Sequence, residues 1–153
     1  MNTEYSEAFF NSFQCVMPQL GIEDIQLTDI SDVGKQIHTP EVACIIGIIG
    51  DLRGNVIYAM SADTAKKIAG TMMGGMELDD FDEIAQSAIS ELGNMLAANA
   101  CTELSLVSVK VDVSTPTLMT GTFSISGSTE HITRITLSMQ DMTFEIFLSL
   151  DKR

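Results

Sequence analysis

DDFDEIAQSAISELGNMLAANACTELSL, at residues 79–106, carries the clearest helical pattern in the chain. Apolar side chains recur in it at steps of three and four residues, which is the period of a helix that turns one face toward a core. These positions are Phe81, Ile84, Ala85, Ala88, Ile89, Leu92, Met95, Leu96 and Ala100. We therefore predict a long helix here, packed along one face, with the other elements arranged around it.

A polar stripe flanks the apolar face of this helix. At about 100° per residue, four side chains fall within a sector roughly 60° wide: Ser87, Glu91, Asn94 and Ala98. Glu91 and Asn94 are neighbours on the helix surface and can enter one partner's cleft together. A carboxylate can bind a cation, and a carboxamide can accept a hydrogen bond from a water or donate one to it. The alternative is that the pair is ordinary solvated surface.

The run SAISELGNMLAANACTELS, residues 87–105, closely resembles the signature helix of the CheC/CheX family, phosphatases of the chemotaxis response regulator CheY. The core of that signature is an Asp or Ser, three residues, a Glu, two residues and an Asn. Ser87, Glu91 and Asn94 match it. The family also carries a proline downstream, and Pro116 lies near that place. Only one copy of the motif is present, so the chain most resembles the CheX branch.

The resemblance implies a fold, a reaction and a partner. The fold is an internally duplicated α/β (α+β) domain with helices packed on a mainly antiparallel sheet. The reaction is hydrolysis of the aspartyl phosphate of a CheY-type response regulator in chemotaxis or two-component signalling. Asn94 would orient the attacking water, and Glu91 would pair with the receiver lysine. Ser87 and Ala98, in the same stripe, would border the contact with the partner.

The resemblance also bears on cofactors and assembly. The charge on the phosphoryl oxygens would be met by a lysine and by Mg²⁺ bound in the partner receiver domain, so the chain needs no cofactor or metal of its own. CheX-like proteins typically form homodimers, and two active stripes would then come from two chains.

The composition is that of one acidic domain. The 153 residues, 45% of them hydrophobic, suffice for a single domain, 1–153, with a substantial core. The formal net charge of −13 argues against nucleic acid or an anionic membrane as partner. The odd number of cysteines, set in apolar company, predicts thiols that fill the core in a reducing environment. With no charged and apolar leader and no apolar run long enough to span a bilayer, we expect a soluble, cytoplasmic protein.

The remaining elements follow from period and from turn residues. A first helix is predicted from Thr3, with its end marked by Pro18 and Gly21, and a second over 62–73 after Ser61. Residues 31–40 are predicted to form a loop. Strands are predicted over 25–30, 42–49, 55–60, 107–113, 120–125, 132–139 and 143–150, with turns at 114–116, 127–129 and 140–141. The similar order of elements in residues 1–75 and 76–153 suggests two diverged copies of one unit.

Other chemistries find no support in the sequence. The glycines of 47–54 lead into a strand, not into a helix as a phosphate-binding loop would. Neither His38 nor His131 has a zinc motif around it. Two alternatives to the phosphatase stay open: a non-catalytic interaction module of chemotaxis or flagellar switch type, and a generic α/β dimer whose stripe is merely solvated.

Overall fold

The structure, a computed structural model, describes residues 3–39, 41–126 and 131–152. These ranges contain the helices α1 (Thr3–Gln19), α2 (Ala62–Met72) and α3 (Glu83–Ser105). The strands before α2 are β1 (Ile25–Asp32), β2 (Gln36–Thr39), β3 (Val42–Gly50) and β4 (Leu52–Met60). The strands after α3 are β5 (Val111–Val113), β6 (Thr117–Thr120), β7 (Phe123–Ser126), β8 (Thr133–Met139) and β9 (Met142–Lys152).

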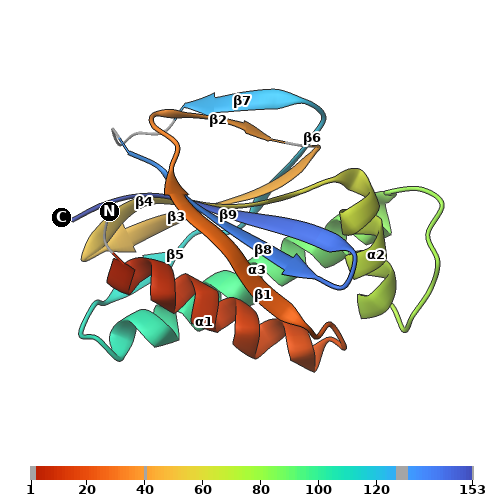
Figure 1. The fold of residues 1–153 in the computed structure, drawn as a ribbon, viewed down its shortest axis with the longest axis horizontal. Coiled ribbons are helices and arrows are strands. Elements are labelled where there is room, and N and C mark those ends of the chain that lie inside the picture. Colours follow the sequence, from red (N-terminus) through yellow and green to blue (C-terminus); the bar gives the residue numbers. More distant parts are fainter. Residues whose placement is uncertain (1–2, 40, 127–130, 153) are drawn as a thin grey trace.

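One antiparallel sheet forms the centre of the molecule (Figure 1). Its strands follow the order β1-β8-β9-β4-β3-β5, and β6 pairs with the same edge of β3 as β5 does. A separate two-stranded sheet, β2 and β7, lies over the face opposite the long helices (Figure 1). The predicted fold class, helices packed on a mainly antiparallel sheet, is confirmed.

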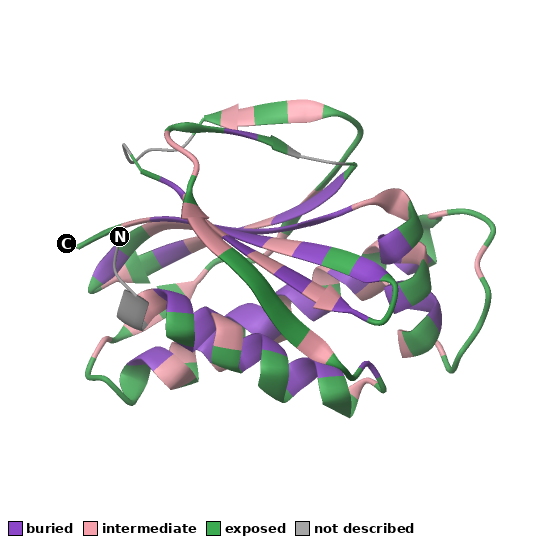
Figure 2. Cartoon of the chain, in the orientation of Figure 1, coloured by how far each residue is buried: buried purple, intermediate pink, exposed green. Residues whose placement is uncertain are grey.

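Helices α1 and α3 lie together against the other face of the sheet (Figure 1). The Ser12 hydroxyl donates to the Leu96 carbonyl at 2.6 Å and joins the two helices. Phe13 of α1 packs on Phe144 of β9 with ring centroids 4.8 Å apart. The buried residues form stripes on these helices and alternate along the strands (Figure 2), as expected for one core between a helical layer and a sheet.

The opposite face of the sheet has its own small core. Ile37 of β2 is buried there with Ala43 of β3, Ile57 of β4 and Phe147 of β9. The alternate side chains of β3, such as Cys44 and Ile46, are buried toward the helices. The continuous apolar run of this strand is therefore explained by burial on both of its faces, which is typical of a central strand.

Several predicted boundaries are confirmed. The strands predicted over 42–49 and 55–60 form the β3–β4 hairpin, although its turn at Asp51 is tighter than predicted and β4 begins at Leu52. Ser61 caps α2, and its hydroxyl oxygen accepts from the Thr64 amide at 3.1 Å. Gln140, with φ of 56°, turns the chain between β8 and β9. Helix α1 differs slightly, because Pro18 lies inside its last turn and not beyond its end.

The prediction of a loop over 31–40 is wrong. β1 continues to Asp32, and β2 occupies Gln36–Thr39. The reason is long-range pairing: β2 is held by β7, and the His38 ring accepts from or donates to the Ser124 hydroxyl at 2.7 Å. Such a partner cannot be read from local turn residues.

Two predicted strands after α3 are also wrong in part. The chain turns back before β5, because the Val109 amide donates to the Leu104 carbonyl at 3.0 Å and Ser108 has φ of 63°. Strand pairing within 107–113 therefore begins only at Val111. The predicted strand over 120–125 is divided between β6 and β7. The predicted turn at 127–129 lies outside the described residues.

The order of strands in the main sheet is symmetric about the central pair β9 and β4, which come from different halves of the chain. Outward from that pair lie β8 and β3, and then β1 and β5, so three strands of the first half, β1, β3 and β4, have counterparts in β5, β8 and β9 of the second. The helices α1 and α3 correspond in the same way. The two-copy origin of 1–75 and 76–153 stays a prediction, and this symmetry of the sheet supports it.

The cysteines do not all fill the core. Cys44 is buried and Cys101 is half-buried, but Cys15 is exposed, and all three are free thiols. The expectation that each is a core residue is therefore wrong for Cys15. Within the described ranges, no helix combines the length and the apolar composition that a membrane crossing requires.

Candidate functional site

The long helix predicted over 79–106 is α3, which begins four residues later than the quoted stretch. Asp82 is its N-cap and accepts from the Ala85 amide at 2.9 Å. Its sheet-facing side is buried as the spacing predicts, through Ala85, Ile89, Leu92, Leu96 and Ala100. Ile84, which we placed on that apolar face, is instead 64% exposed, because it lies beside the polar stripe.

Helix α3 approaches the sheet closely at Gly93, which lies between Glu91 and Asn94 in the sequence. A Cβ atom at this position would meet the Cys44 sulfur of β3 at 2.5 Å, so only glycine allows the two backbones to approach so closely. Burial raises the pKa of the Cys44 thiol to about 11, which keeps it a neutral packing group at physiological pH. The contact between Gly93 and Cys44 therefore fixes the distance between the polar stripe of α3 and strand β3.

An open groove runs beside the polar stripe of α3. Its lining consists of Glu83, Gln86, Ser87, Ser90, Glu91, Asn94, Thr115, Pro116 and Leu118. Three of the four predicted site residues, Ser87, Glu91 and Asn94, thus meet in one groove. Ala98 is exposed on the same stripe but lies one turn beyond the residues that line it.

The two predicted catalytic side chains are available to a partner. Glu91 is exposed, and Asn94 is half-buried at the groove. Within the described part of the chain, neither side chain is engaged in a hydrogen bond or an ion pair. Asn94 is therefore not sequestered in the core, which would have removed the site.

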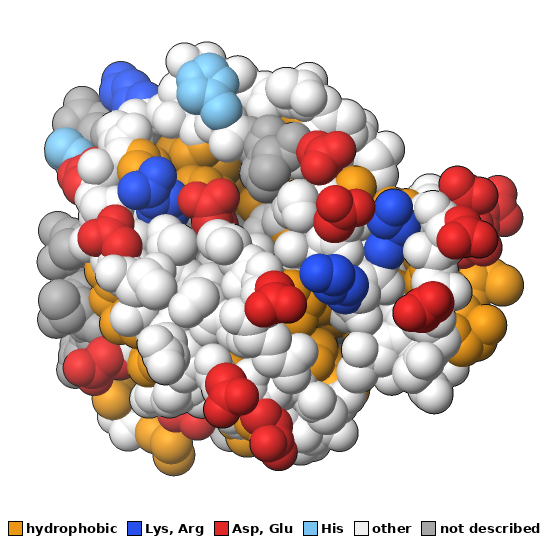
Figure 3. Space-filling model, turned by 45° about the vertical axis from the view of Figure 1, so that its right-hand side comes forward, with side chains coloured by type: hydrophobic (Ala, Val, Ile, Leu, Met, Phe, Trp, Pro, Cys, Tyr) orange, Lys and Arg blue, Asp and Glu red, His pale blue; other side chains and the backbone are white. Residues whose placement is uncertain are grey.

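The groove is negatively charged. Among its described lining residues the charged ones are Glu83 and Glu91, both carboxylates. Figure 3 shows acidic side chains scattered widely over one face of the molecule, with a few basic ones between them. Among the residues described, no group of three or more His, Cys, Asp or Glu side chains could hold a metal ion. The arrangement suits a cationic group of a partner and a polar group held by Asn94.

Asn99 has another role. Its side-chain amide donates to the Cys15 sulfur of α1 at 3.7 Å, and its carbonyl oxygen is buried without a partner among the described residues. Asn99 joins α3 to α1, away from the groove.

The second wall of the groove was not predicted as part of the site. Thr115 and Pro116, in the connection between β5 and β6, face α3 across the groove. The sequence marks residues 114–116 only as a turn. The signal that could have found this wall is Pro116, which the family resemblance already singled out.

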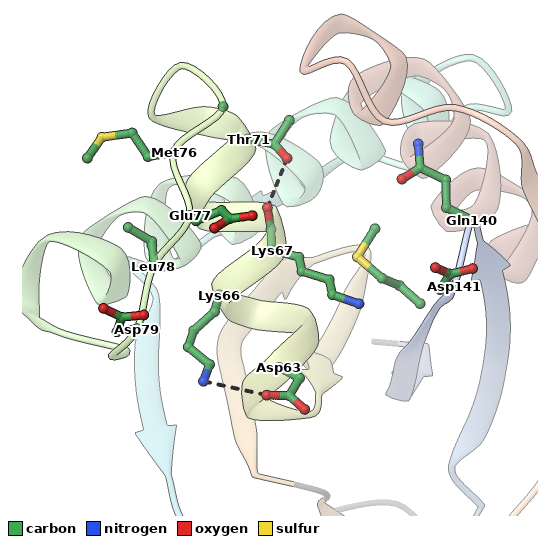
Figure 4. Close-up of a pocket in the computed structure, with 12 residues that line it drawn as sticks. Asp63, Lys66, Lys67, Thr71, Met76, Glu77, Leu78, Asp79, Gln140 and Asp141 are labelled. Carbon is green, nitrogen blue, oxygen red and sulfur yellow. Dashed lines mark hydrogen bonds and ion pairs between the residues drawn. The ribbon is translucent and has the colours of Figure 1, made fainter.

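A second hollow, of about 520 Å³, lies between α2, the connection to α3 and the β8–β9 turn. Figure 4 shows Lys66 directed toward Asp63 and Lys67 extending toward the side of Asp141. Glu77 and Asp79 complete its charged lining, so two lysines face four carboxylates. This balance gives no preference for an anion, and none of the predicted site residues lies here.

Comparison with solved structures places the fold among CheX and CheC-like proteins. A CheC-like superfamily protein from Shewanella sp. PV-4 superposes with a TM-score of 0.88 over 99% of each chain, at 19% identity. A chain of the CheX-CheY-BeF3-Mg²⁺ complex from Borrelia burgdorferi superposes with a TM-score of 0.74 at 19% identity, covering 98% of this chain and 97% of that one.

Sequence comparison narrows the class to a family. Residues 42–138 match the family described as chemotaxis phosphatase CheX. The CheY-P phosphatase CheX of Thermotoga maritima is 38% identical over 110 residues, which are 71% of this chain and 70% of that protein. The chain therefore belongs to the CheX family. The predicted resemblance is confirmed, and so, at the level of the family, is the prediction of a phosphatase. The matched range contains the whole of α3 and Pro116.

Proposed function

We propose that this protein accelerates hydrolysis of the aspartyl phosphate on a CheY-type response regulator in chemotaxis or two-component signalling. The observation that carries the proposal is the groove beside α3, in which Glu91 and Asn94 lie together with side chains unengaged by the described chain. Support comes from the Thermotoga maritima relative, which is named for action on CheY-P, and from the Borrelia burgdorferi complex, which joins a CheX to CheY.

The reaction requires only that the groove orient the attacking water. In an aspartyl phosphate the receiver carboxylate is the leaving group, and a water must attack the phosphorus from the opposite side. The bond from water oxygen to phosphorus forms, the bond from phosphorus to the carboxylate oxygen breaks, and phosphate leaves as H2PO4⁻ with both hydrogens of the water. The Asn94 carboxamide accepts a hydrogen bond from that water and fixes its line of approach. Mg²⁺ in the receiver meets the phosphoryl charge, as the composition of the Borrelia burgdorferi complex suggests.

Glu91 acts on the partner instead of on the water. Its exposed carboxylate lies one turn from Asn94 and pairs with the receiver lysine, so that docking brings Asn94 to the phosphoryl group. Ser87, in the groove, and Ala98, just beyond it, border this contact. The electronegative lining favours encounter with a basic receiver surface.

The assembly and the setting complete the proposal. The protein works as a cytoplasmic homodimer, in which each chain presents one groove to one receiver. A single motif per chain supports two sites per dimer, because only α3 carries the Glu and Asn pair at this spacing.

The test is the decay of a phosphorylated CheY-type receiver in Mg²⁺, measured with and without this protein. Faster release of phosphate, proportional to the added protein, is expected. Binding of the receiver with an unchanged decay would instead favour the non-catalytic interaction module of chemotaxis or flagellar switch type.

Glu91→Ala is expected to weaken docking more than turnover. Loss of one charge-assisted contact should raise the receiver concentration for half-maximal rate about ten- to a hundredfold, since such contacts contribute about 1.5–3 kcal/mol. The measurement is the initial rate of phosphate release as the receiver is varied. Glu7→Ala, which makes the same change of charge at an exposed site on α1, is the control and should behave as wild type. Equal effects of the two variants would mean that Glu91 acts only through the net charge of the protein and makes no specific contact with the receiver.

A further inference from the structure

The second wall of the groove is a β-bulge in the segment that joins β5 to β6, along the edge of β3. β5 and β6 pair with the same edge of β3: Val113 lies opposite Ile48, and Thr117 lies opposite Ile45. Between these pairs, residues 114–116 face only two residues of β3. One extra residue in a strand makes it bend outward, and bulges of this kind re-aim side chains beside functional sites. Here the bulge directs Thr115 and Pro116 into the groove.

Ser114 fastens this bulge to β3 at Gly47. The Gly47 amide donates to the Ser114 hydroxyl at 2.8 Å, and the Ser114 amide donates to the Gly47 carbonyl at 2.9 Å. The same hydroxyl donates to the Thr115 carbonyl at 3.1 Å, which belongs to the peptide that precedes Pro116. The Ser114 side chain therefore links the wall directly to the strand beneath it.

Gly47 leaves room for this link. A Cβ atom at position 47 would lie 3.2 Å from the Ser114 hydroxyl oxygen and 3.6 Å from its Cβ. Its φ is not in the left-handed region, so the close approach of Ser114 is the constraint on a side chain here. The opposite wall is also set from β3, through the contact of Gly93 with Cys44. One strand thus fixes both sides of the groove.

We infer that Ser114 and Gly47 are positioning residues that hold the Thr115–Pro116 wall at the distance from α3 at which the receiver docks. This inference rests on the proposed function, because it assigns the wall to the same partner. The wall acts on docking, whereas Asn94 is held by α3 and keeps its access to the water. Loss of the link should therefore change the affinity for the receiver and leave the turnover of bound receiver nearly unchanged.

The experiment compares wild type, Ser114→Ala, Gly47→Ala and the double variant. For each, the dissociation constant is measured with a receiver carrying BeF3 and Mg²⁺, and KM and kcat are measured from phosphate release. Each single variant is expected to raise the dissociation constant and KM about three- to tenfold, the range expected for one hydrogen bond, with kcat within about twofold. A variant that merely unfolds in part would lower kcat per mole of protein and leave KM unchanged.

The double variant is the sharpest part of this test. With the Ser114 oxygen gone, a methyl group at position 47 has only the ordinary contact at 3.6 Å, so Gly47→Ala should add nothing to Ser114→Ala. Ser105→Ala is the matched control, since it removes a hydroxyl that donates to the Thr102 carbonyl at 2.6 Å outside the groove lining.

The outcomes separate the two proposals. In one outcome the wild-type protein accelerates the decay, and Ser114→Ala and Gly47→Ala both keep the wild-type affinity and KM. This outcome would overturn the assignment of the wall and leave the proposed function standing. Wild-type binding without acceleration would overturn the proposed function, while the dissociation constants would still test the wall. A wild type that neither binds nor accelerates would overturn both. If Gly47→Ala fails to fold, Ser114→Ala alone decides.

Discussion

Asn94→Ala should reduce the stimulated decay of a phosphorylated receiver about a hundredfold, toward its spontaneous rate, because orientation of the attacking water is lost. Binding should be nearly unchanged, since Glu91 and the wall at Pro116 are retained. The side chain of Asn94 has no partner within the described chain, so the free energy of unfolding should change by no more than about 0.5 kcal/mol. Single-turnover decay with saturating protein measures the rate separately from affinity.

Two further variants make the Asn94 experiment specific. Asn11→Ala, at an exposed position of α1, controls for loss of a carboxamide elsewhere and should retain full activity. Asn94→Asp keeps the shape of the side chain but brings a negative charge toward the phosphoryl group, so it should also be inactive. Decay at the wild-type rate with Asn94→Ala would show that the water is oriented by another group and would overturn the mechanism.

Gly93→Ala is expected to destabilise the protein. Alanine in a helix interior is favoured over glycine by about 1 kcal/mol. Against this, the new methyl group would meet the buried Cys44 sulfur at 2.5 Å, and its Cβ at 3.4 Å. Overpacking of a core typically costs about 1–3 kcal/mol, so we expect net destabilisation and a lower Tm. Helix α3 must also move away from β3, which displaces Glu91 and Asn94 and should lower phosphatase activity.

The cause of this effect can be isolated by shortening Cys44. In a Cys44→Ala background the sulfur is absent, and the same Gly93→Ala substitution should become neutral or stabilising by up to about 1 kcal/mol, through helix propensity alone. Urea unfolding of wild type, Gly93→Ala, Cys44→Ala and the double variant gives the coupling free energy between positions 44 and 93. An equal cost of Gly93→Ala in both backgrounds would mean that the contact with Cys44 is not what constrains position 93.

Some elements could be predicted from residues close together in the sequence. The period of α3 and the cap at Ser61 each depend on residues close in sequence, and both predictions are confirmed. The same period predicted that Ser87, Glu91 and Asn94 share a stripe, and the structure brings them together in one groove. Their chemical roles remain predictions, because geometry alone does not assign them.

The features that sequence reasoning missed depend on contacts between distant segments. β2 is a strand because β7 pairs with it, and 31–40 contains no alternating pattern strong enough to indicate this. Likewise, Pro116 enters the site because the registers of β5 and β6 on β3 leave one extra residue between them. Register of this kind is set by tertiary packing and is not visible in a turn motif.

The use of β3 as the common support of both walls has a consequence for how such sequences diverge. Exposed positions of α1, β1 and the β2–β7 sheet line neither wall, so variation should accumulate there more freely than at the residues that β3 uses to hold the walls. Positions 44 and 93, and likewise 47 and 114, should change only in concert: where one side chain of a pair grows, its partner should shrink. An alignment of homologous chains can test this, and independent variation within either pair would count against it.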